Sequence, residues 1–223
     1  TGSDTYSGLA VARLSTDSVT WQPSSTTFSS EGKYIVWYGA DDLAGNRSDY
    51  SGQFINIDIT PPDLTPSISG TIGSNGWYVS NVVVDATATD NLSGISSIVV
   101  SDNGGAAKPV PVTLTSGTHA LTITPKDVAG NSRSTTLDLT IDTDGPIITP
   151  SITGTAGIND WFVSDVDVTA TVSDPVSGMD GTLEVSIDGG AWTTELPIHF
   201  TEGEHSVDLR AYDEAGNESR KTL

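Results

Sequence analysis

Short stretches of alternating apolar and polar residues run through this chain. In residues 82–89 every second side chain is Val or Ala, and residues 166–172 repeat this arrangement. A strand with one buried face has a period of two, whereas a helix has a period near 3.6. Both stretches are therefore predicted to be strands that turn one face toward a core.

Turn residues separate further strand-like stretches. These are residues 9–12, 33–38, 53–58, 95–101, 118–124 and 137–141. Residues 102–105 and 186–192 contain Asp-Asn-Gly-Gly and Asp-Gly-Gly, which are hairpin signals. Pro109–Thr115 is predicted to be an edge strand, because its prolines cannot donate to a ladder of backbone hydrogen bonds.

One turn motif, Asp-x-Ala-Gly-Asn, occurs three times. The copies are Asp42–Asn46, Asp127–Asn131 and Asp213–Asn217, so the motif recurs at intervals of about 85 residues. Its Gly permits a positive φ, and its Asp and Asn side chains can cap nearby backbone N–H groups. About seven short strands per repeat, without helical periodicity, predict an all-β sandwich for each copy.

The repeat divides the chain into three predicted domains, residues 1–59, 60–143 and 144–223. Ile57–Asp63 and Ile141–Pro146 join them, and their prolines favour stiff, extended linkers. Residues 1–59 lack the opening strands of the repeat, and residues 144–223 lack the end of its last strand. We expect either that the chain is part of a longer protein, or that a neighbouring copy donates strands to residues 1–59 in a head-to-tail fibre.

Acidic residues dominate the charge of the 223-residue chain. It has 29 Asp and Glu against 9 Lys and Arg, which gives a net charge of −20 at pH 7. This balance argues against nucleic acid, whose phosphates require Lys and Arg, and against an anionic membrane surface. There is no Cys, so disulfides, thiolate zinc sites and cysteine nucleophiles are excluded. No apolar run is long enough to cross a bilayer, so we expect no direct membrane insertion.

Three motifs recur in the same order along the chain. They are Gly-Trp-Tyr-x-Ser at 76–80, with a weaker copy at 160–164; Asp-x-x-Ser-Gly followed by Leu, Ile or Met at 4–9, 90–95 and 174–179; and Asp-x-Ala-Gly-Asn with Ile-Asp-x-x-x-Pro after it. Together they resemble bacterial immunoglobulin-like repeats, which occur in tandem in secreted and cell-surface proteins. The resemblance covers essentially the whole chain. It implies a string of tandem Ig-like or fibronectin-III-like β-sandwich domains, used as stalks, adhesin shafts or accessory modules of larger secreted enzymes.

Acidic residues gather at the two predicted junctions. In an Ig-like sandwich, two loops of one domain lie at the end where the linker enters, so linker and loop acids should meet. The candidate metal ligands are Asp58, Asp63, Asp90, Asn91, Asp127 and Asn131 at one junction, and Asp142, Asp144, Asp174, Asp213 and Asn217 at the other. Calcium takes six to eight oxygen ligands of these kinds. Two hypotheses remain open: one calcium ion per junction, or solvated turn residues without an ion.

Histidines and aromatic residues offer weaker candidates. His119 and His205 occupy one repeat position that is Tyr34 in the first copy, which favours a surface strand residue over a catalytic base. We therefore predict no catalytic and no organic-cofactor-binding residues. Trp77 and Trp161 recur with the repeat and are predicted to pack in the core or at its rim. A sugar-binding face would have to use the remaining tryptophans, which are Trp21, Trp37 and Trp192.

The sequence thus predicts a non-enzymatic structural segment of an extracellular or cell-surface bacterial protein. It would serve as a stalk, spacer or filament-forming array, stiffened by calcium if the junction acids bind it. Its partners would be neighbouring Ig-like repeats or copies of the same protein. The alternative is an adhesin or carbohydrate-binding accessory module that binds surface glycans.

Overall fold

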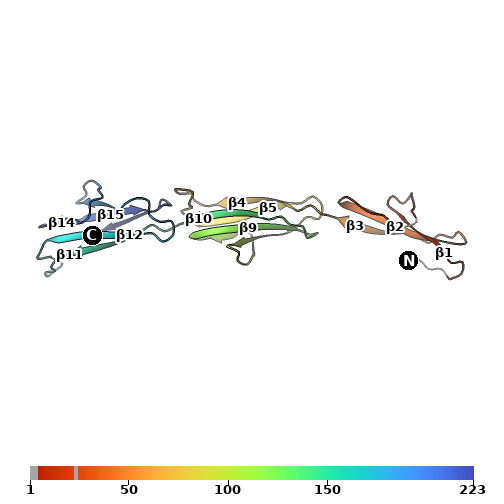
Figure 1. Ribbon diagram of the computed structural model, residues 1–223, viewed down its shortest axis with the longest axis horizontal. Coiled ribbons are helices and arrows are strands. Elements are labelled where there is room, and N and C mark those ends of the chain that lie inside the picture. Colours follow the sequence, from red (N-terminus) through yellow and green to blue (C-terminus); the bar gives the residue numbers. More distant parts are fainter. Residues whose placement is uncertain (1–4, 23–24) are drawn as a thin grey trace. The chain divides into compact units, whose positions relative to one another are not determined.

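A computed structural model describes residues 5–22 and 25–223 of the chain (Figure 1). Every regular element among these residues is a β-strand, so the predicted all-β fold is confirmed. The described residues contain no helix that could span a membrane. Residues 1–4, which begin the first copy of the Asp-x-x-Ser-Gly motif, lie outside the described residues.

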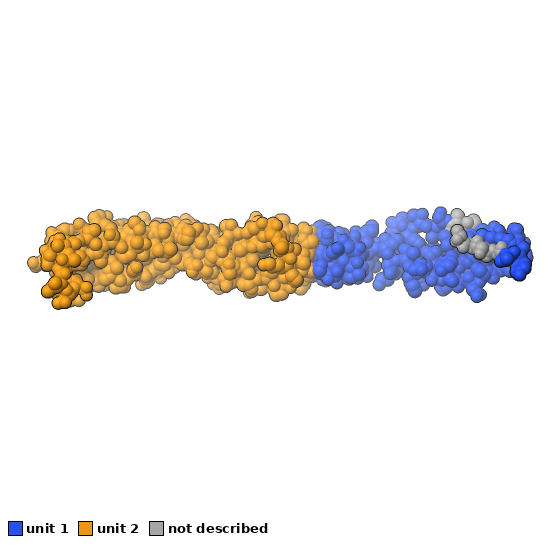
Figure 2. Space-filling model, turned by 90° about the horizontal axis from the view of Figure 1, so that it is seen from below, with its two compact units in different colours: residues 1–63, 88–97, 125–133 blue, residues 64–87, 98–124, 134–223 orange. Residues whose placement is uncertain are grey.

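The chain forms two compact units, coloured separately in Figure 2. The first contains residues 1–63 together with two loops, residues 88–97 and 125–133. The second contains residues 64–87, 98–124 and 134–223. The bounds of the two units do not coincide with the bounds of the sequence repeats. The division into three domains therefore stays a prediction.

The described residues before Asp58, in the first unit, contain one antiparallel sheet. Its strands, in the order β1–β2–β3, are Leu9–Ser15, Gly32–Asp42 and Ser51–Ile57. Each overlaps one of the strand-like stretches identified in the sequence. Val36 is buried on this sheet, while Tyr38 and Phe54 are largely exposed. Strand donation to this sheet stays a prediction.

Residues 63–141 contain two sheets. One has the order β4–β5–β8, with strands Asp63–Ser69, Val82–Thr89 and Val112–Leu114. The other has the order β10–β9–β6–β7, with strands Thr135–Ile141, Gly117–Asp127, Ile95–Asp102 and Lys108–Pro109. A core of Val, Leu and Ile side chains from both sheets includes Val82, Val84, Leu121, Ile123 and Ile141, all of them fully buried. The alternating residues of 82–89 therefore face the core as predicted.

The predicted edge strand Pro109–Thr115 is instead two short strands in different sheets. β7 pairs with β6, and β8 pairs with β5. Pro109 and Pro111 cannot donate to a ladder, so pairing is interrupted between the two strands and the chain crosses from one sheet to the other. Both pieces still lie at sheet edges, as the prolines require.

Residues 147–222 also form two sheets. One has the order β11–β12–β14, with strands Ile147–Thr153, Val166–Ser173 and Ile198–Phe200. The other has the order β13–β15–β16, with strands Glu184–Ile187, Val207–Tyr212 and Glu218–Thr222. Val168, Val185 and Leu209 are buried between them. β4 and β11 were not identified from the sequence, because Pro66 and Pro150 interrupt their alternation.

Both hairpin turns form where Asp-Asn-Gly-Gly and Asp-Gly-Gly predicted them, with positive φ at Asn103 and Asp188. In each repeat, a histidine forms a hydrogen bond with an Asp of this turn. His119 Nδ1 lies 2.8 Å from Asp102 Oδ2, and His205 Nδ1 lies 2.9 Å from Asp188 Oδ2. The two histidines thus have the same structural role in the two repeats. The hydrogen bond to Asp188 raises the pKa of His205 above its ordinary value, and the bond to His205 lowers the pKa of Asp188.

Core packing predicts a large effect for one substitution. Leu121 is 1% exposed, so Leu121→Ala should lower the free energy of unfolding by about 2–5 kcal/mol, through lost burial and a cavity. Urea denaturation measures this change. Val83, on β5 of the other sheet, is 39% exposed, and Val83→Ala should cost less than about 1 kcal/mol. Equal losses in both variants would contradict the assigned core.

The His205–Asp188 pair predicts a pH-dependent contribution to stability. Because the pKa of folded His205 is raised, the stabilisation is fully present below the unfolded value of 6.5 and is lost as pH rises through the folded pKa. Asp188→Asn should therefore cost more stability at about pH 5.5 than at about pH 8.5. An NMR titration should also show the pKa of His205 falling in this variant. A pKa of His205 that is the same in both proteins would disprove the pairing.

Candidate metal centre

Three aspartates meet at the junction of residues 1–59 with the following repeat. Asp58 follows β3, Asp90 follows β5, and Asp127 ends β9. One carboxylate oxygen from each lies within 4.8 Å of the others. Asp127 is 1% exposed, and Asp58 and Asp90 are half-buried. The linker and two loops that are distant in sequence thus bring three carboxylates to one point.

The second junction repeats this arrangement. Asp142 follows β10, Asp174 follows β12, and Asp213 follows β15, again with one oxygen of each within 4.8 Å of the others. Asp142 and Asp213 are fully buried, and Asp174 is half-buried. The recurrence of the same three positions shows that the cluster belongs to the repeat.

Backbone N–H groups hold the carboxylates in place. Asp90 Oδ1 accepts hydrogen bonds from the N–H groups of Leu92 and Gly94, at 3.1 and 2.7 Å. The linker residue Asp58 accepts from the N–H of Ser93 at 2.9 Å through Oδ2. The second junction matches: Asp174 Oδ1 accepts from Val176, Ser177 and Gly178, and Asp142 Oδ2 accepts from Ser177. The Asp-x-x-Ser-Gly loop therefore binds its own Asp and the Asp of the preceding linker.

The asparagines of the Asp-x-Ala-Gly-Asn motif act as hydrogen-bond donors in this structure. Asn131 Nδ2 donates to Asp127 Oδ2 at 2.8 Å and to the Asp58 carbonyl at 3.0 Å. Asn217 Nδ2 donates to Asp213 Oδ2 and to the linker carbonyls of Asp142 and Asp144. Each amide thus connects its turn to the incoming linker, a role that sequence reasoning missed.

Asp127 is charged despite its burial. Burial by itself would raise the pKa of its carboxyl, but hydrogen bonds from the side chain and N–H of Asn131 and from the N–H of Gly130 outweigh it. They hold the pKa below its usual value, so the carboxylate is ionised at neutral pH.

Two of the predicted carboxylate ligands lie outside the clusters. Asp63 is on β4 and pairs at 3.5 Å with Arg133, and its side chain is almost fully exposed. Asp144 contributes its backbone carbonyl and N–H to the second junction, and its side chain is not among the three carboxylates there. Asn91 is exposed in the loop next to Asp90. The other predicted aspartates form the two clusters, and Asn131 and Asn217 donate hydrogen bonds to them.

Each cluster brings three acidic side chains together, and no basic side chain among the described residues pairs with them. Among the described residues, no Lys, Arg or His nitrogen lies within 4.0 Å of any of the six carboxylates. Two unit charges 4 Å apart repel by about 1 kcal/mol in water and by about 4 kcal/mol near a protein surface. Oδ2 of Asp90 and Oδ2 of Asp174 accept no hydrogen bond from described residues. The arrangement suits a divalent cation that binds oxygen, and calcium prefers carboxylate and carbonyl ligands.

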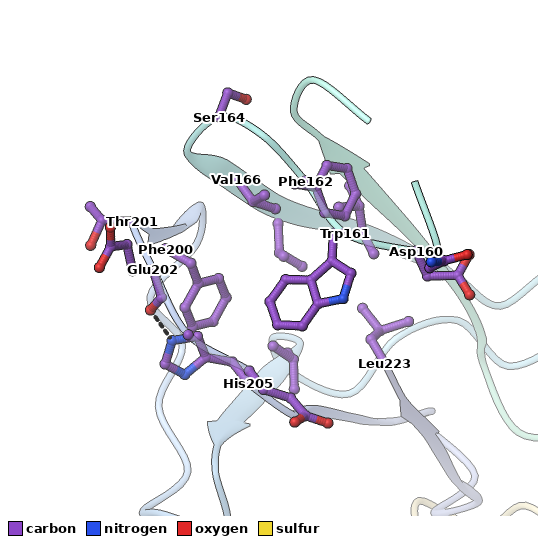
Figure 3. A pocket seen from close by; sticks show the side chains of 16 residues that line it. Asp160, Trp161, Phe162, Ser164, Val166, Phe200, Thr201, Glu202, His205 and Leu223 are labelled. Carbon is purple, nitrogen blue, oxygen red and sulfur yellow. Dashed lines mark hydrogen bonds between the residues drawn. The ribbon is translucent and has the colours of Figure 1, made fainter. Parts of the chain in front are cut away.

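Two of the tryptophans considered for sugar binding have one ring face covered. Trp21 stacks on Tyr50, with ring centroids 4.1 Å apart. The Arg210 guanidinium lies over Trp192, 4.2 Å from the ring centroid. Trp161 (Figure 3) is 64% exposed and is not packed against the core, so the predicted core or rim position is wrong for this residue.

Three solved structures resemble this chain. The fibronectin(III)-like modules of CbhA from Clostridium thermocellum are 15% identical, with coverage of 71% of this chain and 91% of that chain and a TM-score of 0.31. A tetra-tandem repeat in the extending region of a large adhesion protein is 16% identical. The match covers 97% of this chain and 66% of that chain, with a TM-score of 0.35. A structure of a 1.5-MDa bacterial ice-binding adhesin is 16% identical. The match covers 95% of this chain and 83% of that chain, with a TM-score of 0.37. Likenesses this distant transfer no function to this chain.

No curated protein matched the sequence. A family model matched one segment, residues 63–143, and its description is bacterial Ig-like domain. The matched segment contains all of β4 to β10, the first of the two-sheet sandwiches described above. Residues 63–143 of this chain are therefore similar to the bacterial Ig-like domain family.

Proposed function

We propose that this chain is a non-enzymatic structural segment of an extracellular or cell-surface bacterial protein. Its Ig-like modules would follow one another as a stalk or spacer, with a calcium ion at each junction. The observation that carries this proposal is the three-carboxylate cluster, which recurs at both junctions and takes one aspartate from the linker. An ion bound by linker and loops together would limit the freedom of the linker.

Direct packing supports the same role at the second junction. The N–H of Ser74 donates to the Ala215 carbonyl at 2.7 Å, and Asn75 Nδ2 donates to Glu214 Oε2 at 2.7 Å. Residues 73–75 thus contact the Asp-x-Ala-Gly-Asn turn that supplies Asp213 to the cluster. Gly73 permits this approach, because a Cβ there would lie 2.3 Å from the Ala215 carbonyl oxygen. Ion binding and packing would therefore hold the same loop.

Calcium removal should lower the thermal stability of the chain. An ion present at about 100 times its Kd adds about 2.7 kcal/mol to the stability of the state that binds it. We expect the Tm to fall by roughly 10 °C when excess EDTA replaces calcium, and to recover when calcium returns. Differential scanning calorimetry measures both steps. Equal Tm values in calcium and EDTA would rule out the metal centres.

Charge-removing variants locate the sites. Asp90→Asn and Asp174→Asn keep Oδ1 as an acceptor for the loop N–H groups but remove the negative charge. They should weaken the calcium response, and they should not lower the Tm in EDTA, because they relieve repulsion between carboxylates. Asp63→Asn and Asp144→Asn remove the same charge outside the clusters and are the matched controls. If the controls reduced the calcium response as strongly, the assigned ligands would be wrong.

Gly73→Ala should loosen the second junction. The added Cβ would clash with the Ala215 carbonyl and with Val79 Cγ1, at 2.3 and 2.5 Å, so the loop must move. Overpacking of this kind costs about 1–3 kcal/mol. Amide hydrogen exchange at Ser74 should become faster, because its bond to Ala215 is lost.

Gly157→Ala is the control for this effect. Gly157 has the same place in the third repeat, and there an added Cβ would meet only its own hairpin, at 3.0 Å. It should leave exchange at Ser74 unchanged. Unchanged exchange in the Gly73→Ala protein would show that this contact does not hold the junction.

A further inference from the structure

Asn75 connects the hairpin of residues 71–79 to the Asp-x-Ala-Gly-Asn turn of the next repeat. Its Nδ2 donates to the Glu214 carbonyl at 3.0 Å and to Glu214 Oε2 at 2.7 Å. Both residues lie in the second compact unit. No described residue donates a hydrogen bond to Asn75 Oδ1. The contact therefore uses the side-chain amide only as a donor, and it requires the NH₂ group at this position.

The residue after Asn75 is a glycine with an accessible backbone nitrogen. The Trp77 N–H donates to the Ser74 carbonyl, so Asn75 and Gly76 are the central residues of a tight turn, with φ of 52° and 82°. Both are exposed, and no described residue accepts a hydrogen bond from the Gly76 N–H. Apart from its chain neighbours, no described atom lies within 4 Å of where a Cβ of Gly76 would be. Nothing on Gly76 thus shields its nitrogen from the Asn75 side chain.

An asparagine followed by such a nitrogen can lose its amide in a reaction that needs only water. The Gly76 nitrogen bonds to Cγ of Asn75, the side-chain NH₂ leaves as ammonia with the proton of the Gly76 N–H, and a cyclic succinimide forms. Water then adds to either carbonyl of the ring and breaks its C–N bond, which gives Asp or isoaspartate. In sum, an amide and water become a carboxylic acid and ammonia, with no oxidation or reduction.

We propose that Asn75 is a site of spontaneous deamidation, and that its conversion loosens the second junction. The product has a carboxylate in place of the amide, so it cannot donate to Glu214, and it puts a negative charge beside the Glu214 carboxylate. The repulsion acts next to the hydrogen bond between Ser74 and Ala215, which joins the same two segments. Because water does not reverse the reaction, loosened junctions accumulate with time. This inference concerns the packing contact and does not rest on calcium binding.

Two other asparagines in similar turns lack one of the features that make Asn75 reactive. Asn159 has the same φ of 52° in the third repeat, but Asp160 follows it in place of a glycine. Asn103 precedes Gly104, but both ends of its side chain are fixed by the backbone of β9: Oδ1 accepts a hydrogen bond at 3.0 Å, and Nδ2 donates one at 3.0 Å. Asn103 must break both bonds before it can react.

Peptide mapping by mass spectrometry tests the reaction on the intact chain. During incubation at mildly alkaline pH, Asn75 should convert to Asp and isoaspartate about tenfold or more faster than Asn159, because only Asn75 precedes a glycine. The mass change from NH₂ to OH identifies the conversion, and chromatography separates the two product peptides. Asn103 should convert more slowly than Asn75. Equal rates at Asn75 and Asn159 would overturn the proposed site.

Asn75→Asp reproduces one product directly and tests its effect on the junction. Amide hydrogen exchange at Ser74 should become about threefold or more faster, because the hairpin loses its contact with Glu214. Asn159→Asp is the matched control, since it adds the same charge at the equivalent place of the third repeat. It should leave exchange at Ser74 unchanged.

A double variant separates loss of this contact from damage to the hairpin itself. Adding Glu214→Gln to Asn75→Asp supplies an amide that can donate to the new carboxylate, so donor and acceptor exchange places. Exchange at Ser74 should then return toward the rate of the unmodified chain, because the two changes compensate each other. Exchange at the original rate in Asn75→Asp, or no recovery in the double variant, would refute the proposed effect on the junction.

Discussion

The repulsion among three carboxylates at each junction is the constraint on which the rest of this structure depends. Asp58, Asp90 and Asp127 approach within 4.8 Å, and so do Asp142, Asp174 and Asp213. Backbone N–H groups fix the orientation of each carboxylate and offset part of the cost of its burial. They do not neutralise the charge, and no described cation of the protein does so. A divalent ion bound among the three carboxylates would replace this repulsion with attraction.

At each junction, one turn takes part in several interactions. The Asp-x-Ala-Gly-Asn turn supplies a buried carboxylate, and its Asn reaches the linker carbonyl. At the second junction, the backbone of the same turn also accepts a hydrogen bond from Ser74. Because all of these groups belong to one short turn, a displacement of one of them would displace the others.

Local pattern in the sequence determined many of the strands, the hairpin turns and the position of the acids on loops. Alternation placed Val82 and Val84 in the core, and Asp-Gly-Gly and Asp-Asn-Gly-Gly marked the turns, because these features depend on neighbouring residues alone. Tertiary structure decided which acids meet: Asp58 and Asp142 reach the clusters, while the side chains of Asp63 and Asp144 do not. It also divided Pro109–Thr115 between two sheets and made Asn131 and Asn217 donors to the linkers. These outcomes depend on distances between segments far apart in the chain, which are set by the packing of the sheets and not by sequence spacing.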